Sequence, residues 1–141
     1  MESTGEAVEL LRIHHIDYVV RDLDQAIAQY RRLFSVQIMD RECLPSRGVE
    51  LARFRLGDIW VVLVQPVRHD SPVQRFLDSH GEGFFHIAYE VKDARAAADN
   101  LKARGVKLMN EEPRRGVEGW KLVDLDMSET FGLMTQLVEP S

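Results

Sequence analysis

The chain has 141 residues, of which 45% are hydrophobic and 29% are charged, and its formal net charge is −5. This profile suits one globular domain and excludes a disordered chain. Its interleaved charges argue against a nucleic-acid partner, and its apolar runs are too short to span a membrane. With one cysteine and no signal-peptide pattern at its start, the chain is expected to be cytoplasmic.

The first half predicts a strand followed by a helix and three further strands. Residues 12–20 are rich in β-branched and aromatic side chains, which is typical of a strand. Asp22 then stands where it can cap a helix, and apolar residues recur at helical spacing from residue 23 to residue 34. Strands are predicted roughly at 36–43, 49–56 and 59–66.

The second half predicts the same order of elements after a short connection. A short helix is predicted at 71–79 because Pro72 stands in its first turn. A strand at 84–91 is followed by a helix that Asp93 caps and that ends near Gly105. Three strands are then predicted near 106–112, 119–126 and 132–139.

Two short segments repeat in the same order. Residues 15–22 (HIDYVVRD) match residues 86–93 (HIAYEVKD), and residues 62–66 (VLVQP) match residues 136–140 (QLVEP). The repeat predicts an α+β fold of two tandem βαβββ modules that face each other across a small-molecule cavity. We expect one domain over 1–141, with module one at about 10–67, a connection at 68–83 and module two at about 84–139.

Strand alternation sorts the side chains of the two leading strands. His15 and Asp17 share one face, and the equivalent His86 and Ala88 share one face of the matching strand. The opposite faces are largely apolar, carry His14, and are expected to pack on the helices. Two neutral imidazoles on rigid strands suit a divalent metal, although a strand histidine is also commonly a hydrogen-bonded structural residue.

These segments, together with residues 70–77 (DSPVQRFL) and 111–113 (EEP), resemble the vicinal oxygen chelate superfamily. That superfamily includes glyoxalase I, extradiol dioxygenases, methylmalonyl-CoA epimerase and bleomycin-resistance proteins. The resemblance covers about residues 12–139 and looks closest to the methylmalonyl-CoA epimerase branch. It implies that the tandem βαβββ modules form an incomplete barrel around the cavity, and that the site holds a divalent metal such as Co, Ni, Zn, Mn or Fe.

The resemblance also assigns the metal ligands, one from the first and one from the last strand of each module. The first-strand ligands match His15 and His86, and the last-strand positions fall on Val62 and Gln136. Val62 cannot bind a metal, and Gln136 offers a carbonyl oxygen without charge. The expected ligands are therefore His15, His86 and Gln136.

The base that the family uses falls on Leu51, which cannot accept a proton. Asp17, on the face of His15, then becomes the expected catalytic base, with a role in orienting an imidazole as the alternative. Arg53 is expected to bind a carboxylate or phosphate of the substrate. Trp60, Val62 and Leu51 would give this half of the cavity an apolar wall. The phase of the strand that carries Asp124 is open, so Asp124 is a further candidate for the cavity.

Four functions follow, of which the first is a metal-dependent glyoxalase- or epimerase-like enzyme. It would act on a carbonyl or acyl-CoA substrate through an enolate-like intermediate. The alternative is a metal-free protein of the bleomycin-resistance type that sequesters a small molecule. A metal-free enzyme that uses His15 or His86 as acid and base, and an iron-dependent oxygenase, are weaker hypotheses. Homodimers are common in this superfamily, so a homodimer is expected.

Overall fold

The structure, a computed structural model, describes residues 5–38 and 41–141. The chain forms two compact units, and their boundaries fall inside two strands, β1 (Arg12–Val19) and β5 (Gly83–Glu90). We call residues 15–85 the first unit and residues 5–14 with 86–141 the second unit. The expectation that 1–141 form a single domain stays a prediction.

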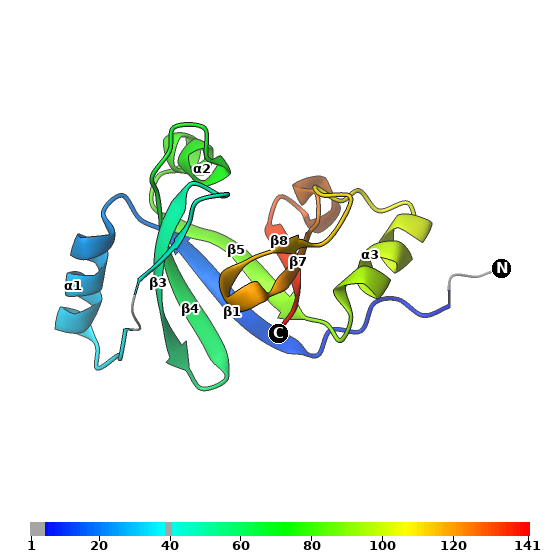
Figure 1. Cartoon of the computed structure of the whole chain (residues 1–141), viewed down its shortest axis with the longest axis horizontal. Helices are drawn as coiled ribbons and strands as arrows, with labels where there is room; N and C mark the ends of the chain where they lie inside the picture. Colours follow the sequence, from blue (N-terminus) through cyan, green and yellow to red (C-terminus); the bar gives the residue numbers. More distant parts are fainter. Residues whose placement is uncertain (1–4, 39–40) are drawn as a thin grey trace. The chain divides into compact units, whose positions relative to one another are not determined.

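Within its described residues, the first unit contains four strands and two helices, besides the start of β5. Its strands follow the order β2-β3-β4-β1, in which β4 pairs with β1 in parallel and with β3 in antiparallel fashion. Helix α1 contacts β3 and β4, and α2 contacts β4. Figure 1 labels these elements. The bounds are β2 (Glu42–Leu44), β3 (Val49–Leu56), β4 (Ile59–Pro66), α1 (Leu23–Leu33) and α2 (Pro72–His80).

The core of the first unit lies between α1 and one face of these strands. Leu23, Ala52 and Leu63 are fully buried there, and Tyr18 packs against them. The carboxylate of Asp22 caps α1 by accepting a hydrogen bond from the backbone N–H of Gln25 at 3.1 Å. The predicted helix-facing side of the leading strand is thereby confirmed at Tyr18.

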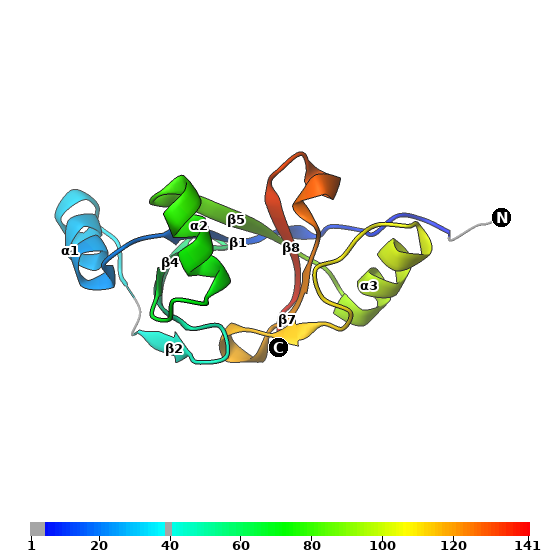
Figure 2. The same cartoon turned by 90° about the horizontal axis from the view of Figure 1, so that it is seen from above.

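The second unit repeats this plan with the strand order β5-β8-β7-β6. Strand β8 pairs with β5 in parallel and with β7 in antiparallel fashion. Helix α3 contacts β7 and β8, and Figure 2 gives a second view of it. The bounds are α3 (Ala94–Ala103), β6 (Arg114–Arg115), β7 (Lys121–Asp124), β8 (Met134–Glu139) and two 3₁₀ helices, η1 (Val117–Gly119) and η2 (Met127–Thr130).

The same local contacts recur in both units, which supports the duplication read from the sequence. The side-chain oxygen of Gln65 accepts from the backbone N–H of Leu23 at 2.7 Å, and that of Glu139 accepts from Ala94 at 2.9 Å. In each unit the last strand therefore satisfies a free donor of the helix N-terminus. The predicted α+β class and the tandem βαβββ modules are confirmed.

Two predicted strands differ from the structure. The strand expected at 36–43 begins only at Glu42, and residues 39–40 lie outside the described residues. The strand expected at 106–112 is reduced to an isolated bridge between Leu108 and Leu125. There the side chain of Asn110, instead of a backbone carbonyl, accepts from the backbone N–H of Asp124 at 3.0 Å, so the regular ladder is interrupted.

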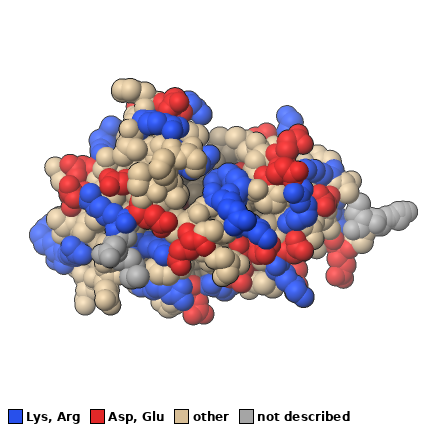
Figure 3. Space-filling model, in the orientation of Figure 1, with Lys and Arg blue, Asp and Glu red and all other residues tan. Residues whose placement is uncertain are grey.

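Acidic and basic side chains are intermixed over the face of the molecule that Figure 3 shows. Within residues 5–38 and 41–141, every helix is too short or too polar to cross a bilayer.

Candidate functional site

In the first unit, β1 places His15 and Asp17 side by side. Both lie on the face of β1 away from α1, because Tyr18, which alternates with them along the strand, packs into the helix core. The Nε2 atom of His15 lies 3.7 Å from Oδ1 of Asp17, and the imidazole is buried. The sequence prediction that these two groups share a face agrees with this geometry.

The register of β4 and β3 extends this face across the sheet. Val62 stands opposite Asp17 on one side and opposite Arg53 on the other. Side chains at paired positions share a face, so Asp17, Val62 and Arg53 form one row. Val62 is 2% exposed and Leu51 is 4% exposed, so buried apolar side chains occupy the two positions where the resemblance would place a ligand and a base.

Arg53, the arginine of this row, lies over the ring of Trp60. The guanidinium carbon of Arg53 lies 4.1 Å from the Trp60 ring centroid, and that of Arg55 lies 4.7 Å from it. Such cation–π contacts are attractive and restrict the arginine head. Trp60 is also the register partner of His15. One face of the first unit thus carries an imidazole, a carboxylate and a guanidinium next to apolar side chains.

In the second unit, three strands bring a different polar set together. Gln136 on β8 stands opposite Ala88 on β5 and opposite Asp124 on β7. His86 lies two residues before Ala88 and therefore shares its face. The neighbouring positions, among them Val123 and Leu137, face the α3 core instead. This alternation fixes the phase of β7, which the sequence left open, and places Asp124 on the face of His86.

Asp124 is the centre of a hydrogen-bond network in this unit. Arg114 donates from Nε to Oδ2 at 2.6 Å and from Nη2 to Oδ1 at 3.3 Å, and Gln136 donates from Nε2 to Oδ1 at 2.9 Å. Burial acts to raise the pKa of Asp124, but Arg114, the hydrogen bond from Gln136 and the nearby His86 outweigh it and hold the pKa below its ordinary value. Asp124 is therefore a carboxylate at neutral pH.

The amide oxygen of Gln136 provides a test of whether the site suits a metal. Gln136 is 3% exposed, and no hydrogen-bond donor among the described residues reaches its Oε1 atom. A buried oxygen without a donor is costly unless another group satisfies it. An amide oxygen and an imidazole on one face of a sheet, here those of Gln136 and His86, are ligand atoms that divalent metals accept, so the residues of this unit fit the implied ion.

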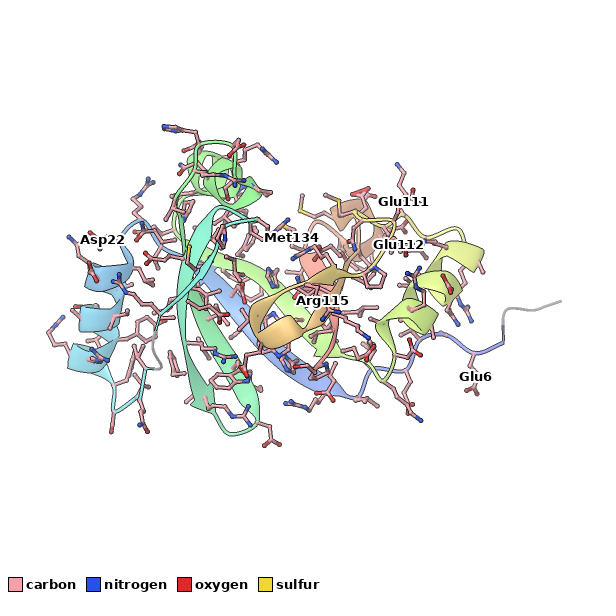
Figure 4. All side chains as sticks on the ribbon, viewed as in Figure 1. Glu6, Asp22, Glu111, Glu112, Arg115 and Met134 are labelled. Carbon is pink, nitrogen blue, oxygen red and sulfur yellow. The ribbon has the colours of Figure 1, made fainter. Side chains whose placement is uncertain are left out.

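The sequence predicted some of these placements and missed others. His14, expected to be structural, makes an edge contact with Trp120 at a centroid distance of 4.5 Å. Arg114 was missed because adjacent arginines on a two-residue strand carry no periodic signal. Figure 4 shows Arg115 on β6, with Glu111 and Glu112 in the segment just before it. Alternation separates the half-buried Arg114 from the exposed Arg115.

The chain matches one protein family and several epimerases of known name. Residues 14–123 match the family described as Glyoxalase/Bleomycin resistance protein/Dioxygenase superfamily. Human mitochondrial methylmalonyl-CoA epimerase is 30% identical over 96% of this chain and 78% of its own length. The ethylmalonyl-CoA/methylmalonyl-CoA epimerase of Cereibacter sphaeroides is 31% identical over 89% of this chain and 96% of its own.

A solved structure agrees with these sequence matches. A variant of Streptomyces coelicolor methylmalonyl-CoA epimerase, in complex with 2-nitronate-propionyl-CoA, superposes with a TM-score of 0.90 at 32% identity. The match covers 94% of this chain and 96% of that one. These relatives are isomerases, which confirms the sequence prediction of an enzyme.

Proposed function

Because the chain belongs to the Glyoxalase/Bleomycin resistance protein/Dioxygenase superfamily, we propose that it is an isomerase of the epimerase type. Its substrate would be an acyl-CoA thioester with an acidic proton next to the carbonyl. The relatives named above act on substituted malonyl-CoA thioesters by their names, which supports this substrate class. The observation that carries the proposal is the carboxylate of Asp17 beside the imidazole of His15.

Asp17 is the proposed catalytic base. Its carboxylate removes the proton α to the thioester carbonyl, a role that needs a carboxylate within hydrogen-bond reach of the substrate, and a solvent-derived proton added to the opposite face of the enolate inverts the centre. The Oδ1 atom of Asp17 lies 3.7 Å from Nε2 of His15. Arg53, held against Trp60, binds the acidic group of the substrate, and Val62 and Leu51 exclude water from the same face.

A divalent metal is the proposed cofactor, with His15, His86 and Gln136 as its ligands. When bound, such an ion would polarise the thioester carbonyl and make the α carbon more acidic. The donor-free amide oxygen of Gln136 supports this assignment. Val62 contributes no ligand, so the ion would keep open positions for substrate oxygens.

A second candidate function is metal-free binding of a small organic ligand. Two buried apolar residues, Leu51 and Val62, favour it because they stand where the resemblance expects a base and a ligand. Such a protein would bind the thioester without exchanging its α proton. The two candidates therefore differ in one measurable step.

Exchange of the α proton tests the proposal. The full chain, loaded with Co²⁺, is incubated with methylmalonyl-CoA in D₂O, and deuterium at the α carbon is followed by mass spectrometry. We expect exchange in the unchanged protein, its loss in Asp17→Asn, and its retention in Asp78→Asn, a matched change on the exposed surface of α2. Binding of the thioester without any exchange would contradict the proposal and favour the second candidate.

A homodimer and a cytoplasmic location stay predictions. Sedimentation of the purified chain over a concentration series tests the first of them.

A further inference from the structure

Gln136 has a charged neighbour whose position suggests a specific task. We infer that Asp124, clamped by Arg114, is a positioning residue that orients the Gln136 amide toward the bound ion and supplies the negative charge that this amide lacks. The inference rests on the proposed function, because it presumes a divalent ion at Gln136. It concerns only residues of the second unit.

The orientation follows from what each group can donate and accept. A carboxylate only accepts hydrogen bonds, so the NH₂ end of the Gln136 amide must face Oδ1 of Asp124, at 2.9 Å. A flipped amide would bring its oxygen against Oδ1 and place two acceptors together. Asp124 thereby directs Oε1 away from itself and keeps it available as a ligand atom.

The strand register places the negative charge of Asp124 near the proposed ion. Asp124 is the β7 partner of Gln136 and shares a face with His86, so an ion at His86 and Gln136 would lie within the field of its carboxylate. A hard cation is held more strongly where a negative charge is near, and the Gln136 amide brings none. Asp124 therefore supplies, from the neighbouring strand, the negative charge that a carboxylate at position 136 would bring to the ion as a ligand.

Arg114 keeps Asp124 in this supporting role. Its guanidinium occupies Oδ2 at 2.6 Å and shares Oδ1 with Gln136, so both carboxylate oxygens already have donors. The backbone N–H of Asp124 is held as well, by the side chain of Asn110 at 3.0 Å. Three of the roughly four acceptor positions of this carboxylate are therefore taken, so binding an ion directly would compete with its contacts to Arg114.

An exchange of the two residues tests the inference. Co²⁺ affinity of the full chain is measured from the visible absorption of the bound ion in the unchanged protein, D124N, Q136E and the double variant D124N/Q136E, with D99N on α3 as the exposed control. We expect D124N to weaken binding by about 10- to 100-fold, as residues that support metal ligands do. The double variant should recover the lost affinity, because it moves the carboxylate to position 136 and leaves an amide at position 124 that donates to it.

Thermal unfolding of the metal-free variants separates this role from a purely structural one. D124N that unfolds earlier but binds Co²⁺ as the unchanged protein does would overturn the inference, as would a double variant no better than D124N. Should D124N fail to fold, the double variant, which keeps a hydrogen bond between positions 124 and 136, is compared with the unchanged protein, and much weaker Co²⁺ binding than in the unchanged protein would overturn the inference. Absence of Co²⁺ binding in the folded, unchanged protein would instead remove the proposed metal, and the inference with it.

R114M is an independent check. Without the guanidinium, Asp124 is free to approach the ion, so we expect retained Co²⁺ binding with a changed visible spectrum. An unchanged spectrum would show that Arg114 does not restrain Asp124.

Discussion

The two units share a scaffold but place their carboxylates differently. In the first unit the acid is Asp17, on the leading strand two residues after His15. In the second unit the equivalent position is Ala88, and the acid is Asp124, on the third strand of the sheet order. Both acids lie on the face away from the helix, and the oxygens of Asp124 are occupied there by an arginine and an amide.

This difference indicates a division of labour between duplicated halves. A carboxylate that is clamped by Arg114 is a poor base, because its pKa is held low and its lone pairs are engaged. The row that holds Asp17 contains Val62 and then Arg53, whose guanidinium stacks on the Trp60 ring. We therefore expect the acid of the first unit to serve proton transfer, and the second unit to supply two of the three proposed metal ligands, His86 and Gln136.

The largest expected effect is on the base. We expect Asp17→Asn to lower kcat for α-proton exchange by about 10²- to 10⁴-fold, the range typical of a lost general base, with little change in substrate affinity. Deuterium incorporation at saturating substrate measures it. A variant with near-normal kcat would show that the acid of the first unit is not the base.

The two histidines should behave alike if the halves contribute equally to one ion. We expect His15→Ala and His86→Ala each to weaken Co²⁺ binding by at least about 100-fold, beyond the range for residues that only support ligands. Equilibrium titration with Co²⁺ gives both values. If only one substitution has this effect, the ion belongs to one unit alone.

The ion pair between Arg114 and Asp124 should stabilise the second unit. We expect Arg114→Met to lower the free energy of unfolding by about 2–3 kcal/mol, because it leaves the buried Asp124 carboxylate without its charged partner. Urea unfolding measures this, with Arg115→Met as the matched control at an exposed neighbour. Equal losses of stability in the two variants would show that the ion pair of Arg114 with Asp124 contributes nothing specific.

Acid should weaken the second unit through the same residue. The pKa of Asp124 lies below its ordinary value of 3.8, so its ionised form stabilises the folded state fully above that pH. The contribution is lost as the pH falls from 3.8 through the folded pKa. We therefore expect the stability difference between the unchanged protein and Asp124→Asn to shrink in this acidic window, as read by urea unfolding at stepped pH; a constant difference would speak against it.

The smallest expected effect is the loss of a helix cap, and it should be equal in the two units. Asp22 and Asp93 cap α1 and α3 through the same bond, to the backbone N–H three residues on. Figure 4 labels Asp22 at the start of α1. We expect Asp22→Ala and Asp93→Ala each to lower the free energy of unfolding by about 1 kcal/mol, measured by thermal unfolding. A much larger loss for one would mean that its cap has a further role.

The sequence by itself determined the duplicated plan, because its signals are local. The histidine-led strands, the capping aspartates and the alternation that sets His15 beside Asp17 depend only on neighbours along the chain. The error at 106–112 arose where this locality fails, since the side chain of Asn110 replaces a strand bond with a residue 14 positions away.

Only the tertiary structure decided the arrangement around Gln136. The group of Arg114, Asp124 and Gln136 comes from three strands, and its members meet because the register of β6, β7 and β8 aligns them. Register is set by the burial of whole strand faces, here against α3, and a slip by one residue would turn every one of these side chains to the opposite face. No pattern along the chain carries that information.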